Sequence, residues 1–447
     1  MNVDDLVTRP ASSARVDGAP RRDALAIGGR VALAIVLLGW ATILTIILAH
    51  PVFVTHDSLI SYAHAWWIEN RLWHGTGIPW RMPVLGHGKA LTFPYGALPW
   101  TVAAVLWPMF GQWSVTLVLV LGVVGVIAAT FWAFPETRRP WWAVAVLLNP
   151  VLLLAPLSGQ LPFLWATALL LAGVGCWRRS RPGWAVVLVA LAQLTHIAVV
   201  GPIALVLVLV RLRTEPRRRL LLGCYALSVC LAAPAIWPVV SSPVFTDSSL
   251  LTKAGQFVGT VSIRIFILAG PIVALLLVRH RQRWIAPALA ALGLTLNVAL
   301  LAPLDAGYAW GALARPQDKA MARYVSTPEF APGATYRVLR SGDGKISLYQ
   351  LIRGGARLDS EFFPESIWYG DFAGERAYSA FLAGRNVDRV LVFHPLARTN
   401  ITNEGDLLTA MAGRPCADGV AGVRLVGTHP DWADYAIDRS CLTGRGR

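Results

Sequence analysis

The first side chains that could do chemistry lie in the stretch 50–100, which is crowded with His, Trp, Pro and Gly. Asp57 follows an apolar segment by a few residues. If that segment spans a membrane, a carboxylate just beyond it must be either well solvated or part of a functional site. It is suited to act as a general base on an acceptor hydroxyl. His64 lies seven residues later, roughly on the same face of a helix, and Glu69 is a second carboxylate beyond it. The alternative, of equal weight, is that Asp57 only caps the N-terminus of that helix.

Metal binding is a second possible use of this stretch. Asp57 could bind a divalent cation such as Mg²⁺ or Mn²⁺ through oxygen. The stretch also holds several histidines without the tight spacing of a zinc motif, which favours polar interfacial residues over metal ligands: His56, His64, His74 and His87.

Three basic residues of the same stretch, Arg71, Arg81 and Lys89, could hold a phosphate or pyrophosphate leaving group. The alternative for each is ordinary snorkelling at the membrane interface. Lys253 and Arg264, in or near a later outer loop, are further phosphate candidates on weaker grounds.

Two other residue types complete the candidate site. His196 lies between two apolar helices and is expected near the same surface, facing the same cavity or capping the hairpin. Trp80 belongs to a set of tryptophans that is more typical of an aromatic belt than of sugar-stacking platforms, although a lipid-linked substrate would arrive at that level.

The composition requires that a membrane position these residues. Of 447 residues, 55% are hydrophobic and only 15% are charged, which is too apolar for a soluble protein of this length. Several apolar runs approach the roughly 20 residues that span a bilayer. Most of the net charge of +15 lies before residue 305, in short clusters between these runs, which is how topology signals are arranged. This arrangement disfavours nucleic acid as a partner.

The basic clusters also predict the topology. Residues 1–28 are expected to be a disordered cytoplasmic tail, and the first span is 31–49, so Asp57 faces the outside. The run 93–110 contains three prolines and is interpreted as a juxtamembrane or re-entrant segment, because a full span there would turn the later Arg clusters outward. The other predicted spans bring the total to about nine: 113–134, 141–157, 161–177, 184–195, 198–210, 220–240, 261–278 and 284–304. The pair 184–195 and 198–210 is short, and its alternative is a hairpin that turns near His196.

Residues 305–447 have ordinary polarity and predict an extracytoplasmic α/β domain. Strands are expected at TYRVLR, ISLYQLI, DRVLVFH, GVRLVGTH and DYAIDR, and helices at QDKAMARYV, ERAYSAFLAG and EGDLLTAMAG. Cys416 and Cys441 could form a disulfide if this domain lies outside the cytoplasm. No GxGxxG or Walker motif indicates a nucleotide site.

The pattern HDSLISYAHAWWIENRLWHGTGIPWRMPVLGHGKALTFPYGALPWTVAAVL resembles the first outer loop of polytopic GT-C-type glycosyltransferases, in particular bacterial membrane proteins labelled as 6-pyruvoyl-tetrahydropterin-synthase-related. The matching elements are Asp57, His64, the step from Gly77 to Trp80, and the run from Gly88 to Pro99. The sequence LTH, ending at His196, also looks like an element of this family. The resemblance covers residues 30–300, with its sharpest part in about fifty of them.

This resemblance implies a GT-C-like membrane domain at 29–304 with its large first outer loop at 51–111, in the plasma membrane of a bacterium. It implies a transferase that takes a sugar from a polyprenyl-phosphate donor, with Asp57 as catalytic base or metal ligand. One departure is that the outer loop PLSGQLP, at 156–162, lacks the second acid that several members have.

Three functions compete on these grounds. The favoured one is transfer of a sugar to a cell-envelope glycan or glycolipid acceptor. The second is a non-catalytic envelope protein whose outer domain binds glycan or protein partners, which the missing acid supports. The third, a transporter, is disfavoured because the spans hold few ionisable residues and show no repeated halves.

Overall fold

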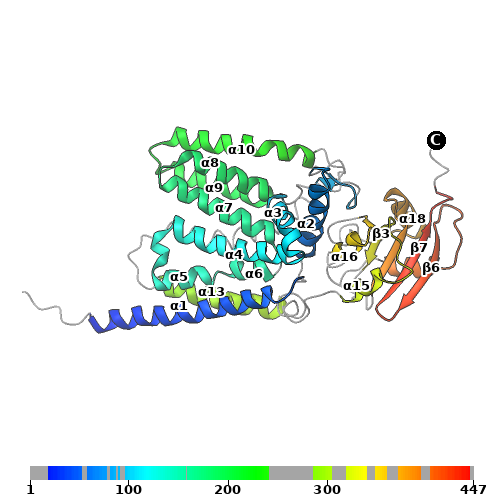
Figure 1. Ribbon diagram of the computed structural model, residues 1–447, viewed down its shortest axis with the longest axis horizontal. Coiled ribbons are helices and arrows are strands. Elements are labelled where there is room, and N and C mark those ends of the chain that lie inside the picture. The colour runs from blue at the N-terminus through cyan, green and yellow to red at the C-terminus, as the bar shows by residue number, and fades with distance from the viewer. Residues whose placement is uncertain are drawn as a thin grey trace, which may run out of the picture.

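The computed structural model describes residues 19–52, 58–77, 81–86, 89–90, 96–157, 159–240, 285–304, 319–339, 348–359, 371–393 and 403–442. It shows a bundle of helices beside a smaller domain that contains a β-sheet (Figure 1). Among the described residues, three helices are long and apolar enough to cross a membrane, in α1 (Ala19–Leu48), α4 (Trp113–Ala133) and α7 (Leu161–Arg178). The chain is a multi-pass membrane protein by this measure.

The remaining helices of the bundle are shorter or less apolar. They are α2 (Ser58–Trp73), α3 (Leu98–Phe110), α5 (Pro140–Leu147), α6 (Pro150–Leu157), α8 (Pro182–Thr195), α9 (Ile197–Leu212), α10 (Arg218–Val240) and α13 (Ile285–Leu304). A 3-10 turn, η1 (Pro135–Arg138), follows α4. Large apolar side chains point outward from the bundle, for example Leu38 at 70% and Val298 at 62% exposure, as expected of a surface that faces lipid.

Over the described residues, the structure differs from the predicted membrane segments in two places; the span predicted at 261–278 lies outside those residues. Helix α1 begins at Ala19, so residues 19–28 are helical where a disordered tail was expected. The single span expected at 141–157 is instead two helices, α5 and α6, because Pro150 lacks an N–H and disfavours helical geometry at Asn149. The carbonyls freed at this break are used by other helices: Trp40 Nε1 donates to Leu147 O at 3.0 Å, and Asn297 Nδ2 donates to Leu148 O at 2.9 Å.

Other expectations agree with the structure. Helix α3 is a 13-residue element that ends at Phe110, which fits the expected short juxtamembrane segment better than a full span. Helices α8 and α9 meet at His196, where the hairpin was expected to turn. Lys253 and Arg264, which were expected in or near a later outer loop, lie outside the described residues.

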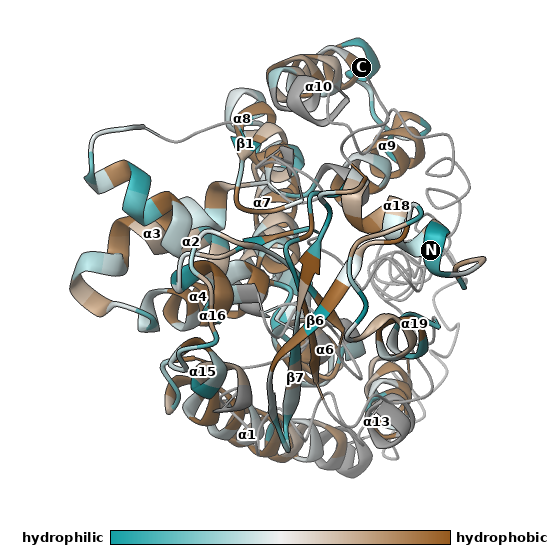
Figure 2. Ribbon diagram, turned by 90° about the vertical axis from the view of Figure 1, so that its right-hand side faces the viewer, coloured by the Kyte–Doolittle hydropathy of each residue, from teal (hydrophilic) through white to brown (hydrophobic). Residues whose placement is uncertain are grey.

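The C-terminal domain is built on a mixed five-stranded sheet with the order β4-β3-β5-β7-β6. Strand β3 (Thr335–Leu339) runs parallel to β4 (Arg357–Leu358) and β5 (Arg389–Phe393). Strand β7 (Trp432–Asp438) is antiparallel to both β5 and β6 (Gly422–His429). The helices are α15 (Lys319–Val325), α16 (Leu348–Arg353), α18 (Glu375–Gly384) and α19 (Glu404–Met411). Viewed from this end, β6 and β7 lie in front of the bundle (Figure 2).

Four of the five expected strands and all three expected helices of this domain are present, but ISLYQLI is wrong as a strand. Its residues from Leu348 form helix α16, which buries Tyr349, Leu351 and Ile352. The helix ends at Arg353, and Gly355, two residues later, takes φ +92°, a conformation that favours glycine.

A buried ion-pair network and a disulfide hold the domain together. Arg337 of β3 is buried and binds Glu404 through two hydrogen bonds, Nε to Oε2 and Nη2 to Oε1, while its Nη1 donates to Asp359 Oδ2 at 2.8 Å. A disulfide joins Cys416 to Cys441.

One hydrophobic core joins the bundle and the C-terminal domain. It runs without interruption from Trp40 of α1, through Ile60 of α2 and Trp100 of α3, to Tyr349 of α16 and Trp432 of β7. The sequence predicted a domain tethered to the last span, and the structure shows one that shares its core with the first loop.

Candidate functional site

Helix α2 begins at Ser58, so Asp57 directly precedes its first residue in the sequence. The residues of its first two turns that the structure describes are buried. They are surrounded by α3, α4 and α16, where the bundle meets the C-terminal domain (Figure 1). The side chains of His56 and Asp57 lie outside the described residues.

His64 is locked inside this core. It is 0% exposed, its Nδ1 lies 2.7 Å from Ile60 O, and its ring stacks on Trp100 at 3.9 Å between centroids. Trp100 Nε1 in turn donates to Ser61 Oγ at 3.1 Å. A side chain enclosed in this way fixes α2 against α3. The catalytic role expected of His64 stays a prediction.

Glu69 and Arg71 lie further along α2. Glu69 follows His64 by five residues, which is about 140° around the helix, so the helix does not bring the two side chains to one face. Partial burial raises the pKa of the Glu69 carboxyl, and the nearby His74 acts in the opposite direction. The guanidinium of Arg71 lies over the ring of Trp67, 4.6 Å from its centroid.

The two other cation candidates of the first loop lie on a small antiparallel ladder, formed by β1 (Arg81–Met82) and β2 (Lys89–Ala90). Arg81 pairs with Ala90, and Met82 pairs with Lys89. The structure therefore brings Arg81 and Lys89, eight positions apart in sequence, onto neighbouring strands. Trp80 lies outside the described residues.

An edge of the C-terminal sheet holds this loop in place. Leu358 of β4 donates its N–H to Val84 O at 2.9 Å, and its carbonyl accepts from Gly86 N at 3.0 Å. Leu85, between them, is fully buried. The loop thus forms a single parallel bridge, between Leu85 and Leu358, with the edge of the C-terminal sheet, a few residues after Arg81.

Helix α16 makes a second contact with the first loop. The rings of Tyr62 and Tyr349 lie 5.6 Å apart, and Gln112 Nε2 donates to the Tyr349 hydroxyl at 2.8 Å. The Tyr62 hydroxyl is 2.6 Å from Thr116 Oγ1 of α4. Sequence reasoning missed Tyr349; the only signal was a short apolar run, which fits a strand as well as a helix.

Two parts of the sequence pattern meet at Gly96. Its N–H donates to Thr195 O at 2.6 Å. A Cβ on Gly96 would lie 1.5 Å from Leu194 O, so only glycine permits this approach. The run that ends at Pro99 therefore touches the LTH element directly. Next to this contact, His196 is 4% exposed and lies edge-to-face with Phe163, 6.2 Å between centroids.

These contacts form one connected unit. His64 of α2 touches Trp100 of α3, Gly96 just before α3 touches Thr195, and His196 follows at the start of α9. Over the described residues, no group of three or more His, Cys, Asp or Glu side chains is arranged to hold a metal ion.

We compared the chain with known proteins. No protein-family model matches the sequence, and no curated protein matches it. Among solved structures, the fold is similar to the archaeal oligosaccharyltransferase AglB from Archaeoglobus fulgidus, solved in complex with an inhibitory peptide and a dolichol-phosphate. The TM-score is 0.44 at 11% identity, over 84% of this chain and 69% of that chain.

Proposed function

We propose that this chain is a membrane glycosyltransferase that moves a sugar from a polyprenyl-phosphate donor to a cell-envelope glycan or glycolipid on the outer face of the membrane. The observation that supports it most is the contact of Gly96 with Leu194 and Thr195. The two sequence elements that resemble GT-C-type enzymes lie about a hundred residues apart, and this contact brings them to one end of the bundle, beside α2.

In this proposal Asp57 is the general base. It takes the proton of the acceptor hydroxyl as that oxygen attacks the anomeric carbon of the donor sugar. The bond from the anomeric carbon to the phosphate oxygen breaks, and polyprenyl phosphate leaves with the electron pair. The position before the first residue of α2 suits this role, because a carboxylate there would be held by the N-terminus of a rigid, buried helix.

The cations of the first loop would hold the departing phosphate. Arg81 and Lys89 share a ladder that the C-terminal sheet braces through Leu358, so their backbone positions are fixed before the donor binds. Arg71, supported on Trp67, would be a third contact. Lys253 and Arg264 remain proposals for the same phosphate.

The other candidates would bind the sugar or the acceptor. His56, Trp80 and His196 are assigned to this group, and Glu69 is kept as a second carboxylate near the site. A divalent cation, if one takes part, would bind through the oxygens of Asp57 and would stabilise charge on the phosphate.

A second function is favoured by one specific observation. The short connection between α6 and α7 contains Gly159 and Gln160 and no acid. A chain without that acid would suit a non-catalytic envelope protein whose C-terminal domain binds glycan or protein partners.

The test is sugar transfer by purified full-length protein in lipid, with a panel of radiolabelled polyprenyl-phosphate sugars and an envelope lipid extract as acceptor. Asp57→Asn is compared with Asp406→Asn, an exposed acid on α19 that serves as the matched control. We expect transfer by wild type and by Asp406→Asn, and none by Asp57→Asn at an unchanged melting temperature.

Two results would count against the proposal. Full transfer by Asp57→Asn would remove Asp57 as the base and keep the enzyme. No transfer by wild type from any donor, combined with binding of envelope glycan by the same preparation, would favour the non-catalytic protein.

A further inference from the structure

The end of the bundle away from α2 is strongly basic. It is formed by η1, the turn from α7 to α8, and the turn from α9 to α10 (Figure 1). Its only acids within these three segments are Glu136 and Glu215. The arginines of the same segments are Arg138, Arg139, Arg178, Arg179, Arg181, Arg211, Arg213, Arg217, Arg218 and Arg219.

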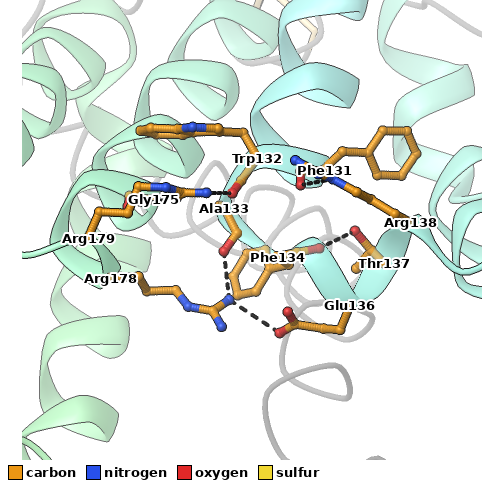
Figure 3. A network of polar contacts seen from close by, with 10 residues as sticks. All are labelled: Phe131, Trp132, Ala133, Phe134, Glu136, Thr137, Arg138, Gly175, Arg178 and Arg179. Carbon is orange, nitrogen blue, oxygen red and sulfur yellow. Dashed lines mark hydrogen bonds and ion pairs between the residues drawn. The ribbon is translucent and has the colours of Figure 1, made fainter.

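One group of these arginines is used inside the protein, at the C-terminus of α4 (Figure 3). Arg178 Nη1 donates to Ala133 O at 2.6 Å and Arg179 Nη2 donates to Trp132 O at 2.6 Å. Arg138 Nε donates to Phe131 O at 3.2 Å. The last carbonyls of a helix lack N–H partners and carry partial negative charge, so these three arginines cap α4.

Both acids are also occupied. Glu136 Oε1 accepts from Arg178 at 3.2 Å. Glu215, which is 7% exposed, accepts from Arg211 Nε at 3.0 Å and from Trp177 Nε1 at 3.2 Å. No acid of these segments is left to neutralise a further arginine.

A second group of arginines has no such use. Their side chains are exposed and make no hydrogen bond or ion pair with any residue in the part of the chain that the structure describes. This unpaired set consists of Arg139, Arg181, Arg213, Arg217 and Arg219. It comes from three different turns, so α5, α8, α9 and α10 together display it.

We infer that the unpaired set binds the phosphate headgroups of acidic phospholipids in the adjoining leaflet. Arg139 and Arg181 follow the ends of α4 and α7, which are long enough to cross a bilayer. The turn from α9 to α10 carries the other three arginines at the same end of the bundle, so the set lies at the level of the headgroups. The planar guanidinium matches a phosphate group, and an anionic leaflet attracts such clusters. The rigid capping of α4 by the other group holds η1, and with it Arg139, in a fixed position.

The test compares two variants with the same loss of charge at the same end of the molecule. In the first, Arg181, Arg213 and Arg217 are each changed to Gln. In the second, Arg138, Arg178 and Arg179 are each changed to Gln. Binding of phosphatidylglycerol and of phosphatidylcholine to the purified full-length protein is measured by native mass spectrometry in a neutral detergent.

We expect the first variant to lose phosphatidylglycerol binding by about fivefold for each arginine removed, with phosphatidylcholine binding and melting temperature unchanged. The second variant should melt earlier and lose much less lipid binding, because its arginines are already held by carbonyls. If the second variant does not fold, Arg178→Gln alone is compared with Arg181→Gln alone, which keeps the loss of charge equal.

Three results would overturn the inference: unchanged phosphatidylglycerol binding in the first variant, equal losses in the two variants, or displacement of the lipid by inorganic phosphate at equal concentration. Resistance of Cys416 and Cys441 to thiol alkylation, equal to that of wild type, checks that each variant has formed its disulfide.

Discussion

Replacing Gly96 by alanine tests the contact on which the proposed site depends. The new methyl group would lie 1.5 Å from Leu194 O and 2.6 Å from Thr195 Cα, both of which are backbone atoms. To restore an ordinary contact distance, the segment before α3 must move by about 2 Å. That movement breaks the hydrogen bond from Gly96 N to Thr195 O, which is 2.6 Å long in the structure.

The loss can be estimated from its two parts. A buried hydrogen bond contributes about 1 kcal/mol and overpacking costs about 1–3 kcal/mol, so the free energy of unfolding should fall by about 2–4 kcal/mol. Sugar transfer should fall with it, because α3 carries Trp100, which holds His64. Unfolding is followed by tryptophan fluorescence of the protein in lipid nanodiscs.

Gly223→Ala is the matched control. No atom lies within 4 Å of the added methyl group on α10, so this variant should be as stable as wild type or more stable by up to about 1 kcal/mol. If Gly96→Ala unfolded like Gly223→Ala and like wild type, the close approach of the two sequence elements would be refuted, and with it the support for the proposed site.

Two further predictions concern the C-terminal domain. Arg337→Met leaves the carboxylates of Glu404 and Asp359 buried without their cation, so the free energy of unfolding should fall by about 3–5 kcal/mol in a denaturant titration. Replacing the exposed Arg376 by Met should change this free energy little. Equal effects of the two substitutions would contradict the buried network. Burial raises the pKa of the Asp434 carboxyl, against the opposing effect of Arg389, so the folded protein holds this proton more tightly than the unfolded chain does. The contribution of Asp434 to stability is therefore present at low pH and is lost as the pH rises through its raised pKa. Between about pH 4 and about pH 8, the melting temperature should decline less in Asp434→Asn than in wild type. The same decline with pH in both proteins would argue against this role of Asp434.

The fold was predictable where one local pattern dominated. Strands β5 and β7 follow runs of β-branched and aromatic residues, and α18 follows a clear helical period. Helix α16 was not, because LYQLI fits a strand as well as a helix, and burial against α2 decides the outcome. The break between α5 and α6 could have been expected from Pro150, whereas the partners of its carbonyls, Trp40 and Asn297, could not.

The candidate site was predictable in composition and less so in arrangement. The turn at His196 was expected, and Arg81 and Lys89 were assigned to one loop. The contact of Gly96 with Thr195 depends on pairing across a long stretch of chain, for which the sequence offers only a glycine. The burial of His64 follows from Trp100 covering its ring, and no spacing within the loop indicates that. Asp57 stays a prediction.

The core shared by the bundle and the C-terminal domain sets an order of events during biosynthesis. Gln112 and its partner Tyr349 are 237 positions apart, so α2 and α4 leave the ribosome long before the helix that covers them exists. Until α16 arrives, Tyr62 and its neighbours lack one wall of their final environment. The first loop thus reaches its final shape only after the last part of the chain has been made, and a protein stopped early in synthesis would leave this loop open to proteases.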